Sequence, residues 1–142
     1  MVRRIDKHLN KRRQVINLAD VLKDIELMTQ VKERLDLLKD LSKLLFNKAP
    51  EYKLEFVDAT VWAGRARDNG LLEFNLNMLR ENPETFIKDT VPHEYAHLVA
   101  GCRNHHNNIW RNVFVQFNGS GRRCHRYSVQ SSVEQRQARK RK

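Results

Sequence analysis

The sequence has 142 residues, of which 40% are hydrophobic and 31% charged, and it carries a formal net charge of +10 and two cysteines. This length suits one domain with its own core. No apolar run approaches the ~20 residues that span a bilayer, so we expect no membrane span. No apolar segment follows the charged N-terminus, so we expect no signal peptide. Two cysteines are too few for a disulfide framework, which favours the cytoplasm, or the nucleoid if the protein binds DNA in a prokaryote or phage.

The positive charge is concentrated at the two ends of the chain. Residues 1–13 carry a net charge of +5 and residues 122–142 one of +7, whereas residues 14–121 carry −2. We therefore expect a basic N-terminal arm (1–13), a near-neutral domain (14–121) and a basic C-terminal tail (122–142). Cationic ends bind phosphate backbones by releasing counterions, so the charge predicts contact with nucleic acid; the alternative is that the ends only aid solubility.

An apolar stripe in the first third of the chain predicts a helix that begins after Asn17, which can cap it. Its apolar residues are separated by three or four positions: Leu18, Leu22, Ile25, Met28, Val31, Leu35, Leu38, Leu41 and Leu45. A plausible break at Thr29-Gln30 leaves open one long helix or a helix pair, and residues 47–50 end it. We expect this stripe to pack on the domain's own core; a coiled-coil partner is the alternative.

Three β-prone runs follow, at residues 53–57, 60–63 and 71–76. Asp68-Asn69-Gly70 is favourable hairpin chemistry, because Asn and Gly tolerate positive φ. We expect a small antiparallel β-sheet of about three strands. Combined with the helices on either side of it in the sequence, this sheet predicts an α+β fold.

Helical signals return after the sheet. A short helix is expected at 78–81, and Asn82-Pro83 marks the start of a longer one, with Asn as cap and Pro at the first helical position. Pro92 predicts either a kink or the start of a new helix. Gly101 is a natural end.

This helix contains the pattern H-E-x-x-H at residues 93–97. Residues four apart lie on one face of a helix, so the imidazoles of His93 and His97 can converge on one metal ion. Glu94 lies beside them, where it can accept a proton from water that the metal activates. The pattern predicts a metal site of hydrolytic type.

A catalytic zinc ion usually has a third protein ligand. The only acidic residue after Glu94 is Glu134, inside the basic tail, which argues against a downstream carboxylate as the third ligand. The remaining candidates are three histidines and, less favoured, two cysteines: His105, His106, His125, Cys102 and Cys124. Apolar spacing predicts a helix at 107–118, which would hold His106 one turn before Trp110 and makes His106 the favoured ligand.

Between Val57 and Phe117 the chain resembles the SprT-like (Spartan-type) zinc metalloprotease domain. The resemblance rests on four stretches in the same order as in that family: Trp62-Ala63-Gly64-Arg65-Ala66-Arg67-Asp68-Asn69-Gly70, Phe74-Asn75-Leu76-Asn77, Val91-Pro92-His93-Glu94-Tyr95-Ala96-His97 and His106-Asn107-Asn108-Ile109-Trp110. It implies that His93, His97 and His106 bind Zn²⁺, that Glu94 is the catalytic base, and that residues 14–121 form the protease domain. It also implies a protein substrate, which in cellular members is bound or crosslinked to DNA.

The chain departs from this family pattern in two places. Members commonly have Gly where this chain has Asn107, and many end in a cysteine-rich zinc ribbon for which only Cys124-His125 remains here. The basic tail can replace the nucleic-acid contact of that ribbon through five residues: Arg136, Arg139, Lys140, Arg141 and Lys142. We expect the protein to be a monomer.

Two questions stay open at the level of sequence. A group that stabilises the oxyanion is expected, with Tyr95, His105 and Arg103 as candidates. The alternative function is that of a non-catalytic nucleic-acid-binding protein whose zinc site is structural, closed by Cys102 or Cys124 as a fourth ligand.

Deleting residues 126–142 should weaken DNA binding and flatten its dependence on salt, because the deletion removes the cations that displace counterions. Fluorescence anisotropy with a labelled oligonucleotide at several salt concentrations measures both effects. Unchanged binding would reject a role for the tail.

Overall fold

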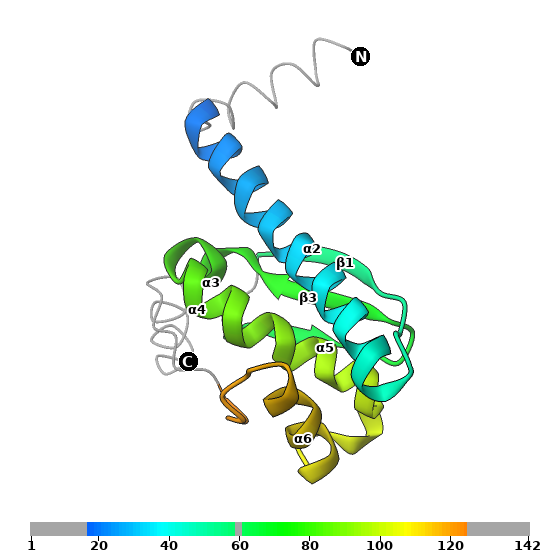
Figure 1. Cartoon of the computed structure of the whole chain (residues 1–142). Helices are drawn as coiled ribbons and strands as arrows, with labels where there is room; N and C mark the ends of the chain where they lie inside the picture. Colours follow the sequence, from blue (N-terminus) through cyan, green and yellow to red (C-terminus); the bar gives the residue numbers. More distant parts are fainter. Residues whose placement is uncertain (1–16, 59–60, 125–142) are drawn as a thin grey trace, which may run out of the picture.

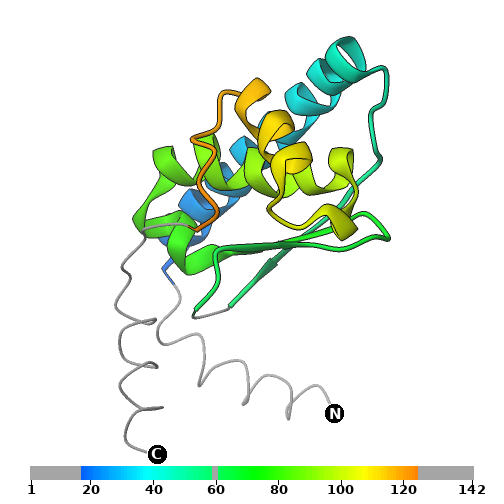
Figure 2. The same ribbon diagram turned by 90° about the horizontal axis from the view of Figure 1, so that it is seen from below.

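The computed structural model describes residues 17–58 and 61–124, and these form an α+β fold in which helices cover one face of a three-stranded sheet (Figures 1 and 2). The expected fold class is therefore confirmed. The arm at 1–13, His125 and the tail residues from 126 onward lie outside the described residues. In the described part, no helix is long and apolar enough to cross a membrane.

The first described element is one uninterrupted helix, α2 (Leu18–Phe46), of 29 residues. Asn17 caps it as predicted, because its side chain accepts a hydrogen bond of 2.8 Å from the backbone N–H of Ala19. Thr29 does not break the helix, since its hydroxyl donates to the carbonyl of Ile25 one turn earlier. Asn47 ends the helix in the left-handed conformation, with φ of 56°. The sequence left one or two helices open, and there is one.

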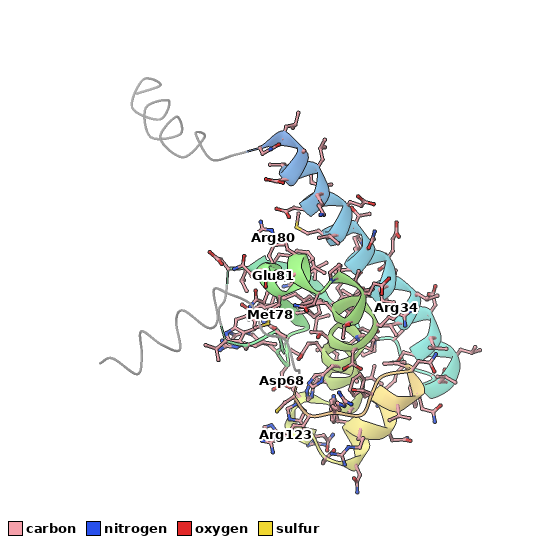
Figure 3. The ribbon with its side chains drawn as sticks, turned by 90° about the vertical axis from the view of Figure 1, so that its left-hand side faces the viewer. Arg34, Asp68, Met78, Arg80, Glu81 and Arg123 are labelled. Carbon is pink, nitrogen blue, oxygen red and sulfur yellow. The ribbon has the colours of Figure 1, made fainter. Side chains whose placement is uncertain are left out.

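The apolar stripe of α2 packs on the core between Leu27 and Leu41, and Leu45 near its end is 44% exposed. Its buried residues are Leu27, Val31, Leu35, Leu38 and Ser42. Leu18, Leu22 and Ile25, by contrast, are 72%, 57% and 50% exposed. The expectation that the whole stripe packs on the core is wrong for these first turns, because α2 projects past the rest of the domain (Figure 1). Arg80, labelled in Figure 3, ties this part of α2 to the domain through a paired contact with Asp24 of 2.6 and 2.8 Å.

The sheet is mixed. Its strands are β1 (Lys53–Val57), β2 (Gly64–Ala66) and β3 (Leu71–Asn75), in the order β1-β3-β2. The hairpin of β2 and β3 is antiparallel as predicted, but β1 pairs with β3 in parallel. The second strand lies at 64–66 and not at 60–63. β3 takes the centre because its Leu72 and Phe74 are both fully buried, so β1 pairs with it instead of with β2.

A nearly continuous helical stretch carries the chain from the sheet to the H-E-x-x-H motif. It consists of α3 (Leu76–Glu81), α4 (Pro83–Thr85), the π-helix η1 (Phe86–Thr90) and α5 (Val91–Ala100). In η1 the N–H of Val91 bonds to the carbonyl of Phe86, five residues back. This wider turn places Pro92 in the first turn of a new α-helical segment, where its missing N–H costs least.

Two elements complete the fold, the short 3-10 helix η2 (Cys102–Asn104) and α6 (Asn108–Gln116). Asn107 caps α6 by accepting hydrogen bonds from the N–H groups of Ile109 and Trp110. The predicted helix at 107–118 is thus confirmed, with shorter ends. α6 packs against α5 through Trp110 and Phe114, both fully buried, and this contact builds the floor of the site.

Candidate metal centre

Helix α5 supplies the first two members of a histidine cluster. His93 and His97 lie one turn apart, with ring centroids 5.3 Å from each other, and both rings contact the buried indole of Trp110. His97 is only 8% exposed. The i, i+4 spacing predicted this convergence, and α5 delivers it.

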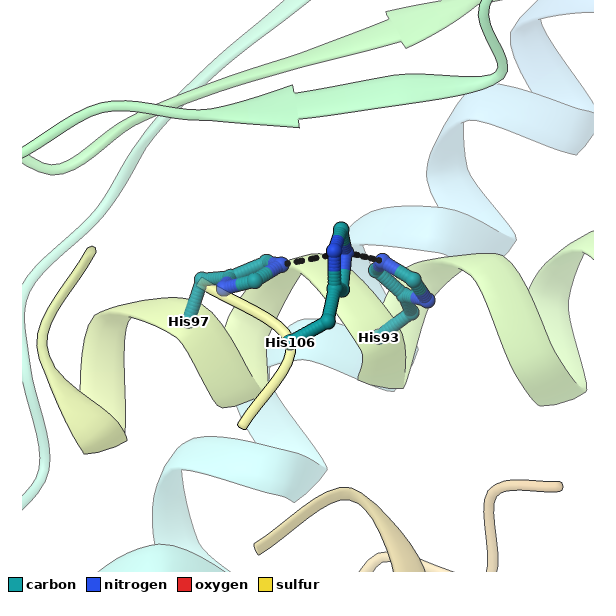
Figure 4. Close-up of side chains that lie close together, drawn as sticks. All are labelled: His93, His97 and His106. Carbon is teal, nitrogen blue, oxygen red and sulfur yellow. Dashed lines mark hydrogen bonds between the residues drawn. The ribbon is translucent and has the colours of Figure 1, made fainter. Parts of the chain in front are cut away.

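The third member, His106, comes from the loop after α5. Gly101 ends the helix with φ of 93°, and His105 itself adopts a positive φ of 41°, so the chain turns back over the helix. Figure 4 shows His106 between the other two rings, below the strands of the sheet. Its Nε2 lies 3.1 Å from Nε2 of His93 and 3.3 Å from Nε2 of His97. The structure brings His106, and not His105, into the cluster.

The cluster has the dimensions of a metal site. Two imidazole nitrogens bound tetrahedrally to one zinc ion lie about 3.4 Å apart, given a Zn–N distance of ~2.1 Å, which matches the separations here. Burial is the main cause that lowers the pKa of His97 to about 4, and electrostatic interaction with His106 and His105 lowers this pKa further. Burial also lowers the pKa of His106, with a further contribution from Arg123. Both rings are therefore held neutral, the form that binds metals, although imidazole suits several transition metals besides zinc.

Among residues 17–58 and 61–124, three side chains converge so that they could hold one metal ion. Cys102 and Cys124 both line the surrounding pocket, but among the described residues neither belongs to the group of converging ligand atoms. Structural zinc sites usually close with four protein ligands, whereas catalytic sites hold three and leave one position open. The geometry thus favours the second type of site over a closed structural one.

Glu94 lies directly beside this cluster. It is 6% exposed, and its Oε2 is 3.6 Å from Nε2 of His93. Burial raises the pKa of Glu94 to about 8. A divalent cation among the histidines would favour the charged carboxylate and oppose this effect. A buried carboxyl group with a raised pKa next to a metal cluster has the properties of a general base.

Trp110 contacts all three histidines and holds their rings in place. Its indole Nε1 donates to the carbonyl of His93 over 3.1 Å. The indole ring stacks on His97 at 5.2 Å and 17°, and meets His106 edge-on at 4.6 Å. Because Trp110 is fully buried, these rings have little freedom, and the sequence-based argument that Trp110 positions His106 is consistent with this contact.

Sequence reasoning missed the role of Gly64. β2 passes so close to α5 that a Cβ atom at this position would lie 2.8 Å from Cγ of Glu94 and 3.1 Å from the ring of Phe74. Any side chain here would displace the carboxylate or the strand. The available signal was a glycine directly after the β-prone run at 60–63, since glycine in a strand often marks a close approach of the backbone to another group.

The cluster lies at the bottom of a pocket of about 720 Å³. Its walls include β2, the loop after α5 and the segment that follows α6. Of the three oxyanion candidates, only His105 lines this pocket. Tyr95 is fully buried and its hydroxyl donates to the carbonyl of Pro50, and Arg103 is exposed elsewhere on the loop.

Comparisons with known proteins agree with this geometry. A profile of the SprT-like family matches residues 35–133. Protein SprT of Pseudomonas putida strain F1 is 33% identical over 110 residues, which cover 71% of this chain and 66% of that protein. Protein SprT of Pseudomonas putida strain W619 is 43% identical over 72 residues, 46% of this chain and 44% of that protein. The matched region thus spans about two thirds or less of these relatives, and no solved structure matches significantly.

The histidine cluster predicts a clear difference between two neighbouring variants. His106→Ala should lower zinc affinity by more than the ~10–100-fold that loss of an outer-shell partner causes, because it removes one of three converging nitrogens. His105→Ala, the matched control, should leave zinc affinity nearly unchanged. Competition with a chromophoric chelator measures both values. Loss of zinc in the His105 variant alone would contradict the arrangement described here.

Proposed function

Since the chain belongs to the SprT-like family, we propose that it is a zinc-dependent endopeptidase in which His93, His97 and His106 bind the metal and Glu94 is the catalytic base. One observation carries the proposal: three imidazole nitrogens converge beside a buried carboxyl group at the bottom of a pocket open to solvent. A purely structural site has no need of this carboxyl group.

Each residue of the cluster has a defined task in peptide hydrolysis. Bound zinc would supply Lewis-acid polarisation of the scissile carbonyl and lower the pKa of water. Glu94 accepts a proton from the attacking water and returns it to the leaving nitrogen. Its burial keeps bulk water away from the carboxyl group, and Gly64 leaves the space in which that group lies. Trp110 keeps the three imidazoles in their orientation.

The free edge of β2 offers a way to align a peptide. In the hairpin, the carbonyl of Ala63 accepts a backbone hydrogen bond from the N–H of Asn75, and the N–H of Arg67 donates one to the carbonyl of Leu71. In an antiparallel pair the alternate residues turn their backbone groups outward. Gly64 and Ala66 therefore present N–H and C=O groups to the pocket, where an extended substrate can pair with them.

We propose as substrates proteins that are associated with or crosslinked to DNA, and this part of the proposal rests on charge placement and on the resemblance to the family. The cationic residues at 1–13 and, in the basic tail, Arg136, Arg139, Lys140, Arg141 and Lys142 would hold the enzyme on DNA near its substrate. The protein would act as a monomer in the cytoplasm, at the nucleoid in a prokaryote. Proteolysis of a DNA-binding protein with and without DNA tests this assignment.

Glu94→Gln should keep bound zinc and reduce cleavage by about 10²–10⁴-fold, the usual contribution of a general base. Metal analysis by mass spectrometry and cleavage of an unstructured protein substrate measure the two properties. Glu84→Gln, which neutralises an exposed carboxylate away from the pocket, is the matched control. Cleavage at the wild-type rate by the Glu94 variant would show that another group is the base.

Gly64→Ala should lower kcat/KM by about 10²-fold while zinc stays bound, because the new methyl group occupies the space of the Glu94 side chain and an ångström of misplacement can cost that much. Thermal unfolding separates this effect from general destabilisation. Normal activity in this variant would mean that β2 can move aside, and that its close approach does not position the base.

A further inference from the structure

The segment after α6 is fastened back onto the helix that leads into the metal motif. The N–H of Ser120 donates to Oδ1 of Asp89 over 2.7 Å, and its hydroxyl donates to Oδ2 over 3.0 Å. Arg111 adds a bond of 3.2 Å from Nε to the carbonyl of Gly121. Residues 31 apart in the sequence are thus joined, and the chain that follows Ser120 is directed along the pocket.

This attachment brings two arginines to the mouth of the pocket. Arg122 and Arg123 are exposed and line it, and Arg123, labelled in Figure 3, is near enough to His106 for its charge to act on that ring. Within the described residues, neither guanidinium forms an ion pair. The sequence assigned both arginines to a DNA-binding tail, but their placement connects them with the site.

Four arginines line the pocket, Arg65, Arg67, Arg122 and Arg123, whereas the acidic side chains near it are Asp89, Glu94 and Asp68, which acts on Cys102 of the lining. Asp89 lines the pocket but is occupied by its two hydrogen bonds with Ser120. Glu94 lies buried at the bottom beside the histidines. Arg65 stands on the opposite wall, with its guanidinium 4.1 Å from the ring centroid of Trp62. The mouth therefore attracts negative charge, and planar guanidinium groups bind the paired oxygens of carboxylates and of phosphates.

We propose that Arg122 and Arg123 are specificity-determining residues that bind acidic side chains of the substrate next to the scissile bond, so that the enzyme prefers peptides rich in Asp and Glu at that place. The proposal rests on the endopeptidase function proposed above. A peptide is favoured over nucleic acid because both arginines line the same pocket as His106, and that pocket is also lined by Gly64 and Ala66 of the edge strand β2.

The proposal is tested with three peptides that differ only in two adjacent residues beside the cleaved bond, which are both Asp, both Gln or both Lys. The full chain loaded with zinc is the enzyme. The wild type should cleave the Asp peptide with about tenfold higher kcat/KM than the Gln peptide, as two partly exposed ion pairs allow. In Arg122→Gln/Arg123→Gln this ratio should fall to near one, and in Arg122→Glu/Arg123→Glu the Lys peptide should become the preferred substrate.

Lys88→Gln/Arg103→Gln is the matched control, since it removes the same charge from exposed positions that do not line the pocket; its ratio should equal that of the wild type. Equal cleavage of all three peptides by the wild type overturns the specificity proposal and leaves the endopeptidase function standing. Cleavage of none overturns both.

A competition experiment tests whether Arg122 and Arg123 bind nucleic acid instead of the peptide. If single-stranded oligonucleotide inhibits the wild type but not Arg122→Gln/Arg123→Gln, and the wild type shows no preference among the peptides, the two arginines serve nucleic acid and the proposal is wrong. Binding of the Asp and Gln peptides to Glu94→Gln, measured by anisotropy, should reproduce the preference without turnover; equal binding overturns it.

Discussion

The packing of Trp110 against the H-E-x-x-H helix is the contact on which the site depends. Nε2 of His106 lies 3.1 Å from Nε2 of His93 and 3.3 Å from Nε2 of His97, and rings that were free to turn would not keep these separations. The indole prevents this by stacking on His97, meeting His106 edge-on and donating to the carbonyl of His93. A single buried side chain thus couples the packing of α6 on α5 to the geometry of the ligands, and the cluster is shaped before any ion binds.

The opposite wall imposes a second constraint. β2 must come close enough to α5 to enclose Glu94, yet leave room for its carboxyl group, and a strand without a side chain at Gly64 meets both demands. The same strand is an edge of the sheet because β3, the most deeply buried strand, takes the centre. Among the described strands, the mixed topology therefore places β2, with Gly64 and Ala66, at the edge of the sheet that lines the pocket.

The chain on either side of these elements adapts to the site in different ways. The π-turn before α5 lets Pro92 enter the helix directly before His93 without breaking the helical path. Asp89 in that turn also holds Ser120, so the segment that enters the motif and the segment that leaves α6 are joined at the pocket. The first turns of α2 stand apart from this arrangement, with Leu18 and Leu22 exposed beyond the domain.

What the sequence determined by itself is local or nearly local. The spacing of His93 and His97 on one helix, the cap at Asn17 and the hairpin at Asp68-Asn69-Gly70 follow from backbone geometry within a few residues. The choice of His106 also came from spacing, because one helical turn separates it from Trp110. The order of elements and the α+β class could be read from the same periodicities.

Only the tertiary structure decided the parallel pairing of β1 with β3, the approach of Gly64 to Glu94 and the arrival of Arg122 and Arg123 at the pocket. Each depends on contacts between residues far apart in the chain, such as Ser120 and Asp89. Such contacts depend on how the whole core packs, and a short segment of sequence does not contain the information that decides this packing.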